Sequence, residues 1–459
     1  MKLLKDEVLN GLAERGANVA QFVSFGPDEK QRFCRVRNVP VGQQFPTVFQ
    51  ALECLLQNAE AASINIRTFL VDKPDGNPFE YGLKSASDAE AKVVKFLREG
   101  FHVIVNETIH VNDGGFSGVV FGSLIEGAPN DIPRCVEKPG CMQLPRAMGL
   151  DLIKKVYGFV FHMPFDRSYR VEFSVHPHRV GYGHDRQIIW QAEQYDAGAI
   201  PPEPQLIWPN KFSRIMGDKA FGLLVADLYG FPVPRTMVFG RQIPQFELGL
   251  ELKNGEPVWV RTVPKEQTPG KFQTVRGYKD PFQIMQDDDP DNTKIAAILI
   301  QDGVPATYSG SAITSSDGEM ILEGCRGYGD DFMIGQRSPE ELPASVTGET
   351  GFLFDRMRER LGDIRFEWVF DGRHAWVLQL HRGKSASSGS VIYPGTPARW
   401  VQFDVQQGLE PLRALVAEAQ KNGLGVVLNG EVGITSHFGD ILRKAKVPAR
   451  LLQIKTNVA

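Results

Sequence analysis

The chain contains an internal repeat, and this repeat constrains its fold more than any other feature of the sequence. The segment from Lys5 to Gln191 shares an ordered series of residues with the segment from Lys219 to Gln379. In each segment the lysine is followed by an arginine, a Ser-Gly pair and two glutamates, which are Arg67, Ser117, Glu126 and Glu172 in the first and Arg261, Ser309, Glu323 and Glu367 in the second. Because this order is kept over a long stretch, we interpret it as a tandem duplication. The alternative is that apolar strands ending in polar residues resemble one another by chance.

Helix and strand signals alternate in the second segment and predict a mixed α/β (α+β) fold. Asp218 is placed to cap a helix over residues 220–229, and Gly230 is placed to end it. Short apolar runs predict strands, which lie at 236–239, 257–262, 295–301, 320–323 and 376–379.

A small α/β module is predicted at the C-terminal end, after a Gly/Ser-rich segment at 383–390 that we expect to be a linker or mobile loop. It would contain a helix at about 409–420, a strand at 425–428 and a last helix after His437. We therefore expect three domains: a first copy over 1–200, a second copy over 205–385 and the module over 398–459.

Composition excludes several classes of protein. The 459 residues are 42% apolar and 23% charged, which is typical of a globular chain, and the formal net charge is -4. That balance argues against nucleic-acid or anionic-membrane binding through a basic surface. A run of 18 apolar residues is absent from the sequence, so a membrane span is not expected. Five cysteines without a CxxC pattern favour free thiols and a cytoplasmic location.

The second copy carries the groups that binding of Mg-ATP requires. Lys219 and Arg261 offer positive charge to phosphate oxygens. The glycines of the Gly327–Gly329 turn would let backbone N–H groups approach a phosphate. Glu367 and Gln379 lie 12 positions apart on two candidate strands, and a hairpin would bring their oxygens together as ligands of the kind Mg²⁺ prefers. Taken alone, each residue has an ordinary structural explanation, such as a surface ion pair.

These motifs resemble a known family. The series Gly217-Asp-Lys219, Val260-Arg261-Thr, Phe366-Glu367-Trp and Leu378-Gln379 is similar to the ATP-binding domain of phosphoenolpyruvate synthase, pyruvate phosphate dikinase and rifampicin phosphotransferase, an ATP-grasp fold. The resemblance covers roughly residues 212–382. Two departures are Asp218, where the family has glycine, and His381, where it usually has arginine.

The resemblance implies roles for individual residues. Lys219 and Arg261 would contact the phosphates of ATP, and Gln301 would lie at the adenine hinge. Glu367 and Gln379 would hold Mg²⁺. Glu323, Gly327 and Gly329 would complete the nucleotide site, and the loop at 268–274 would cover it.

The first copy and the C-terminal module pose separate questions. The first copy has no counterpart of the Gly-x-Gly turn, so it either binds another ligand or has lost the nucleotide. His176, His178 and His184 follow Glu172 there and suggest a metal site, with ordinary core or surface histidines as the alternative. In the module, Thr435-Ser436-His437 is similar to the phosphohistidine motif of the same family, which implies that His437 carries phosphate. The alternative is a helix start at which His437 is structural.

Three functions follow from these patterns. The first is a dikinase-type phosphotransferase that uses Arg261 and His437 and passes phosphate from Mg-ATP to a small acceptor that the sequence does not identify. The second is an ATP-grasp ligase that forms an acyl phosphate. The third is a nucleotide-sensing module without turnover. The products of ATP would distinguish them.

Overall fold

The computed structural model describes residues 3–71, 77–109, 113–130, 140–161, 167–195, 206–252, 256–266 and 274–452. The chain divides into two units, Met1–Phe212 and Ser213–Ala459. The predicted domain limits at residues 200 and 205 lie outside the described residues, as do residues 268–273 of the predicted covering loop. Among the described helices, none has the length and apolar character needed to cross a bilayer.

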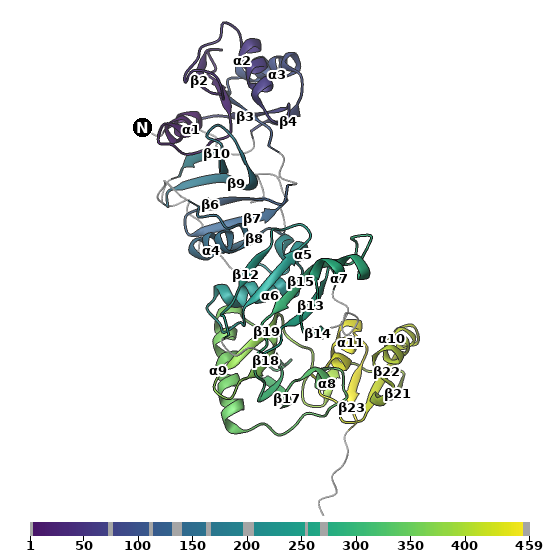
Figure 1. The fold of residues 1–459 in the computed structure, drawn as a ribbon. Helices are drawn as coiled ribbons and strands as arrows, with labels where there is room; N and C mark the ends of the chain where they lie inside the picture. The colour runs from purple at the N-terminus through teal and green to yellow at the C-terminus, as the bar shows by residue number, and fades with distance from the viewer. Residues whose placement is uncertain are drawn as a thin grey trace, which may run out of the picture. The chain divides into compact units, whose positions relative to one another are not determined.

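The first unit contains two five-stranded sheets (Figure 1). Helices α2 and α3 cover one face of the first sheet, and their apolar side chains, such as Leu52 and Val93, are fully buried against it. The elements are α1 (Lys5–Glu14), β1 (Phe22–Phe25), β2 (Gln31–Arg35), α2 (Val48–Asn58), β3 (Ile64–Phe69), β4 (Phe79–Leu83), α3 (Ala86–Arg98), β5 (His102–Glu107), β6 (Phe116–Phe121), β7 (Leu124–Pro129), β8 (Met142–Pro145), α4 (Arg146–Tyr157), β9 (Tyr169–Val180) and β10 (Asp185–Gln194).

The second unit contains a five-stranded sheet, a four-stranded sheet and a C-terminal sheet that also has four strands. After α5 (Lys211–Met216), which crosses the boundary in the chain, its elements are α6 (Asp218–Leu228), β11 (Thr236–Gly240), β12 (Phe246–Leu248), β13 (Trp259–Pro264), β14 (Thr274–Arg276), α7 (Pro281–Asp288), β15 (Ile295–Gln301), β16 (Tyr308–Thr314), β17 (Met320–Arg326), α8 (Asp330–Met333), α9 (Ala344–Leu361), β18 (Ile364–Phe370) and β19 (Ala375–Arg382).

The two units share one strand topology. The first sheets run β2-β1-β5-β3-β4 and β12-β11-β15-β13-β14, which is the same order of successive strands. The second sheets run β10-β9-β6-β7 and β19-β18-β16-β17, and the first unit adds the edge strand β8. The strand registers agree as well. In the first unit Val119 lies opposite Glu126 and Glu172, and in the second Ser311 lies opposite the matching Glu323 and Glu367. The predicted α/β class and the tandem duplication are confirmed.

The start of α6 differs from the prediction. Gly217, not Asp218, is the N-cap, and Asp218 lies in the first helical turn. Gly217 has φ 84°, and a Cβ built on it would lie 2.2 Å from Cγ1 of Val263. Only glycine fits this turn without strain, because both the backbone angle and the nearby β13 exclude a side chain. Gly230 has φ 72° just after the helix, as predicted.

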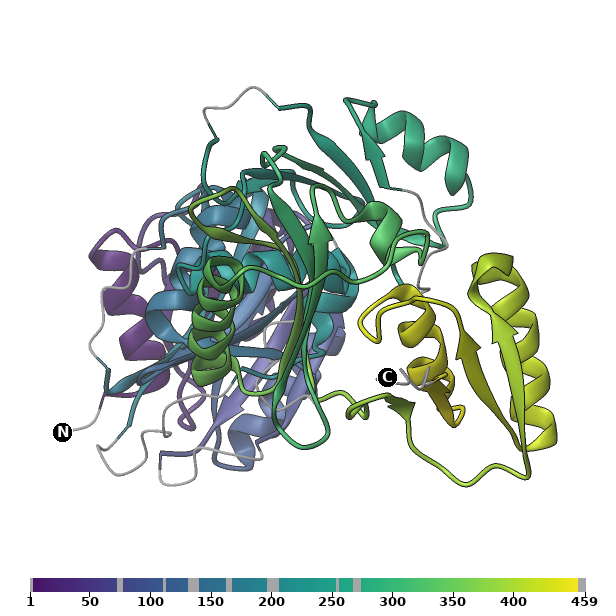
Figure 2. The ribbon, with the colours of Figure 1, turned by 90° about the horizontal axis from the view of Figure 1, so that it is seen from below.

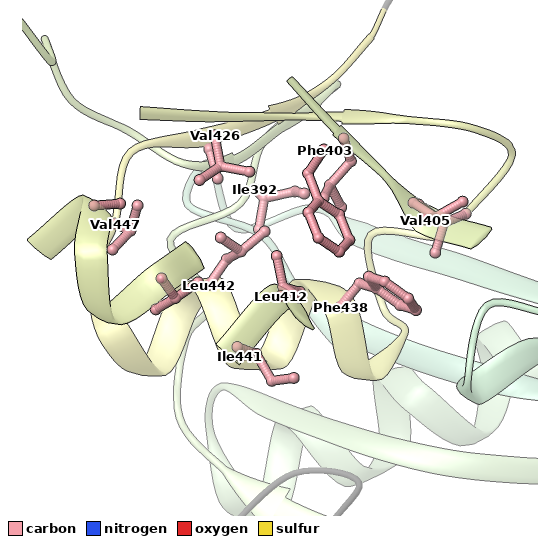
Figure 3. Close-up of a cluster of buried hydrophobic side chains, with 14 of the residues drawn as sticks. Ile392, Phe403, Val405, Leu412, Val426, Phe438, Ile441, Leu442 and Val447 are labelled. Carbon is pink, nitrogen blue, oxygen red and sulfur yellow. The ribbon is translucent and has the colours of Figure 1, made fainter. Parts of the chain in front are cut away.

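The C-terminal module has its own sheet and two main helices, seen in yellow-green and yellow in Figure 2. Strands β21, β22 and β23 are parallel, and β20 pairs antiparallel with β23. Side chains from α10 and α11, including Leu412 and Phe438, pack against Phe403 and Val426 of the sheet (Figure 3). The elements are β20 (Val391–Tyr393), β21 (Arg399–Asp404), α10 (Leu409–Asn422), β22 (Leu424–Asn429), α11 (His437–Ala445) and β23 (Ala449–Leu451).

Candidate functional site

A cavity of about 380 Å³ lies within the second unit, between the five-stranded and four-stranded sheets and the start of α11. Six of the residues predicted from the sequence line it: Lys219, Arg261, Gly329, Glu367, Gln379 and His437. They come from α6, β13, the start of α8, β18, β19 and α11. Residues more than 200 positions apart in the chain therefore meet at one site.

The predicted oxygen pair is formed by the hairpin of β18 and β19. Glu367 lies directly opposite Gln379 in the register, next to a bulge between Glu367 and Trp368. Nη1 of Arg261 lies 3.4 Å from Oε2 of Glu367. Nε of Arg261 is buried and has no hydrogen-bond partner in the structure. A buried guanidinium group with an unused donor can bind a further anion at little cost in reorganisation.

Lys219 is the second residue of α6 and points into the cavity. Burial lowers the pKa of its ammonium group; the nearby Glu367 and Asp440 raise it, and Arg261 lowers it further. Among the described residues no salt bridge of Lys219 is observed. Lys219 and Arg261 together give this end of the cavity a positive potential suited to phosphate.

Three further side chains line the cavity although no site role was predicted for them: Arg365, His381 and Asp440. Arg365 is two residues before Glu367 on β18, and His381 is two residues after Gln379 on β19. Because side chains alternate along a strand, this spacing places each pair on one face of the sheet, and the period of two could have revealed them. Asp440 lies one helical turn after His437, where α11 turns it inward.

Two of these side chains form an ion pair, and His381 contacts Gln379. Nη1 of Arg365 lies 2.9 Å from Oδ1 of Asp440. Burial opposes the charge of Asp440, but Arg365, His437 and Arg443 hold the pKa of its carboxyl well below the usual range. Burial, together with Arg365 and Lys219, lowers the pKa of His381, whose Nε2 lies 2.7 Å from Nε2 of Gln379. His381 is therefore neutral near pH 7.

His437 begins α11 and lines the cavity, as the predicted motif requires. Ser436 is the N-cap, but its hydroxyl donates to the carbonyl of Gly433 and does not cap the helix. Nδ1 of His437 is buried without a hydrogen bond and lies 3.9 Å from Oδ2 of Asp440. The imidazole of His437 thus lies at the cavity, next to the carboxylate of Asp440.

Three residues implied by the resemblance do not line the cavity. Gln301 is fully buried at the end of β15, and its Nε2 donates to Oγ1 of Thr236. Gly327 has φ 79°, and its carbonyl accepts from the hydroxyl of Ser309, so it shapes the turn that carries Gly329. Glu323 on β17 binds the loop before α11 through its carboxylate. Only the neighbouring residues of these positions, such as Asp302 and Tyr328, reach the cavity.

An aromatic pair lines another part of the cavity. The rings of Trp259 and Tyr328 lie 5.8 Å apart between centroids. The guanidinium group of Arg276 lies 4.4 Å from the centroid of Tyr328, and Glu256 accepts a hydrogen bond from the Tyr328 hydroxyl. Flat apolar surface of this kind suits a planar ring such as a nucleobase.

The equivalent position in the first unit is filled by its own charges. Arg67 and Arg170 lie 2.9 Å and 2.8 Å from the carboxylate of Glu172, and Lys5 lies 2.7 Å from Glu193. Burial opposes ionisation of Glu172, but the two arginines lower its pKa to about 2. Glu193 stands two residues after Gln191, where the second copy has neutral His381. The lysine that is unpaired in the second copy therefore has a counter-ion in the first.

The histidines of the first unit do not form the suggested metal site. His176 is buried between Asp113 and Ser174, at 2.9 Å and 2.7 Å. His184 bonds with Arg37, and His178 is exposed. Across the described ranges, groups of three or more His, Cys, Asp or Glu side chains able to hold a metal are absent.

Comparisons with known proteins identify no family. No family model matches the chain, and no curated protein sequence matches it. Among solved structures, the chain is similar to D-alanine–D-alanine ligase from Bacillus anthracis complexed with ATP, with 16% identity, 36% of this chain and 54% of that chain covered and a TM-score of 0.25.

Two further similar structures are a RimK domain ATP-grasp protein from Sphaerobacter thermophilus and L-amino acid ligase from Bacillus licheniformis. The first shows 19% identity over 37% of this chain and 60% of that one, with a TM-score of 0.24. The second shows 13% identity over 39% of this chain and 42% of that one, with a TM-score of 0.23. The chain matches less than two thirds of the length of each of these three structures. All three are named as ligases or as an ATP-grasp protein, and none as a dikinase.

Proposed function

We propose that the second unit binds Mg-ATP in its cavity and transfers a phosphoryl group from it. The observation that carries this proposal is the meeting of the Glu367–Gln379 pair with Lys219 and Arg261 in one cavity. Oxygen ligands for a hard cation and donors for phosphate stand side by side there, and phosphoryl transfer depends on positioning by such groups.

The residues present fit Mg²⁺. The Glu367 carboxylate and the Gln379 amide supply two oxygens on neighbouring strands, and Mg²⁺ commonly takes only one or two protein ligands beside phosphate oxygens and water. Asp330 adds a second carboxylate to the lining; burial raises its pKa and Arg261 lowers it. When bound, the ion would neutralise charge on the phosphates.

The chain's own cations would bind and orient the phosphates. Arg261 has a free Nε donor, and Lys219 lines the cavity beside it. The aromatic surface of Trp259 and Tyr328 would bind the base, while Asp302 and Val304 after β15 line the cavity beside it.

The first phosphate acceptor separates two forms of the proposal. In a dikinase-type enzyme, His437 would accept the phosphoryl group, which its place in the cavity favours. In an ATP-grasp ligase, a substrate carboxylate would accept it and His437 would be structural; two of the three similar structures named above are called ligases. Release of AMP supports the first form and release of ADP the second, whereas binding without product supports a sensing module.

Calorimetry with Mg-ATP tests the proposal. We expect Lys219→Ala and Glu367→Ala each to weaken binding by about tenfold to a hundredfold, because a charge-assisted contact contributes roughly 1.5 to 3 kcal/mol. Lys279→Ala, at an exposed lysine of the same unit, is the matched control. Unchanged affinity in both cavity variants would refute the nucleotide site.

A further inference from the structure

Glu323 binds the loop that precedes His437. One carboxylate oxygen, Oε1, accepts from the backbone N–H of Ile434 at 3.0 Å. The other, Oε2, accepts from the backbone N–H of Thr435 at 2.8 Å and from its hydroxyl at 2.7 Å. Three donors of one short loop thus converge on one carboxylate, and charge-assisted bonds of this kind are the stronger class of hydrogen bond.

The close approach of this loop depends on Gly433. A Cβ built on Gly433 would lie 2.6 Å from Oε2 of Glu323 and 3.0 Å from the ring of Phe332. A side chain at this position would push the loop away from the carboxylate. The sequence therefore contains both the acceptor and the space that the contact requires.

Other contacts hold the same module in place. Ile313 of β16 belongs to the buried cluster that contains Phe438 and Ile434, so the module shares a core with the four-stranded sheet. Ser387 of the Gly/Ser-rich segment is fully buried, donates to the carbonyl of Ile392 and accepts from Arg443. The segment 383–390, expected to be a linker or mobile loop, thus has at least one residue, Ser387, that is hydrogen-bonded to its neighbours.

We propose that Glu323 is a positioning residue that fixes the loop 433–436, so that His437 works in place at the cavity and not as part of a swivelling carrier. The resemblance implied a nucleotide contact for Glu323, whereas its carboxylate is occupied by the loop. The chemistry that His437 performs rests on the proposed function; the positioning itself does not.

Hydrogen–deuterium exchange of the full chain without nucleotide tests the positioning. In Glu323→Ala we expect the amides of Ile434 and Thr435 to exchange about tenfold faster or more, because their acceptor is lost. Glu323→Gln keeps one acceptor oxygen and should give an intermediate rate. Glu319→Gln, at an exposed glutamate next to the same strand, should match the parent protein.

Gly433→Ala provides a second route, since it displaces the loop and leaves Glu323 intact. If Glu323→Ala increases exchange throughout the unit, Gly433→Ala and Glu323→Gln decide: faster exchange confined to 433–437 supports the proposal. Exchange at the parent rate in these variants overturns it.

Steady-state kinetics then connects the positioning to the reaction. In Glu323→Ala we expect kcat to fall at least about tenfold while KM for ATP changes less than about twofold, because Glu323 lies outside the cavity. Glu323→Gln should recover part of kcat. A rise in KM with unchanged kcat would make Glu323 a nucleotide contact and overturn the proposal. If the parent protein neither binds nor turns over ATP, the proposed function fails, and the exchange experiment still decides the role of Glu323.

Discussion

At the scale of single residues, the sequence predicted the charged centre of the site but not its surroundings. Lys219, Arg261, Glu367, Gln379 and His437 meet in one cavity. The order of the first four in the repeat made their meeting predictable, because equivalent positions in a duplicated fold share a place, whereas His437 lies outside the repeat and was predicted from its own motif. Glu323 could not be placed correctly, since its partner is a loop more than 100 positions away and no local pattern encodes that contact.

The buried carboxyl of Glu126 should make the stability of the protein depend on pH. Burial raises the pKa of its carboxyl to about 7, against an ordinary value of 4.5. When a carboxyl has a raised pKa in the folded state, the free energy of unfolding falls as pH rises between these two values, because the carboxyl ionises first in the unfolded chain. Glu126→Gln should therefore stabilise the protein by about 2–3 kcal/mol at pH 8 and by little at pH 5. Urea unfolding at both pH values measures this, with exposed Glu53→Gln as the control. An equal effect at both pH values would contradict the assignment.

At the scale of elements, periodicity predicted the long strands well and the connections poorly. The run from Ile295 to Gln301 is apolar except for its last residue, and it forms the central strand β15 with those limits. The three-residue strands β12, β14, β20 and β23 escaped prediction, because they are short and their pairing comes from tertiary contacts. The Gly/Ser composition of 383–390 suggested freedom, yet buried hydrogen bonds hold Ser387.

Gly217 tests the element that carries Lys219. Gly217→Ala should destabilise the protein by about 2–3 kcal/mol, because it forces an unfavourable φ and a contact with Val263. Gly348→Ala is the matched control, since Gly348 lies within α9 with no heavy atom within 4 Å of the new Cβ. That change should stabilise by up to about 1 kcal/mol, as expected for alanine in a helix. Thermal or urea unfolding measures both, and equal effects would refute the steric argument.

In the chain as a whole, one fold occurs twice, and the matching charged residues of the two copies have different partners. In the second unit the lysine and arginine line a cavity, whereas in the first they are paired with Glu193 and Glu172. The repeat predicted the shared fold. The lysine has a carboxylate partner, Glu193, only in the first copy, because the second copy has His381 at the matching position. We therefore expect one nucleotide per chain.

Arg67 and Arg261 are equivalent residues that make this contrast testable. Arg67→Ala should leave nucleotide affinity unchanged and cost about 3 kcal/mol of stability, because it removes a partner of a buried carboxylate. Arg261→Ala should do the reverse: its 3.4 Å contact with Glu367 is long, and Arg261 lines the cavity, so affinity should fall about tenfold or more while stability changes little. Calorimetry gives stoichiometry and affinity, and urea unfolding gives stability. Two nucleotides per chain, or equal losses of affinity in the two variants, would show that the first copy also binds nucleotide.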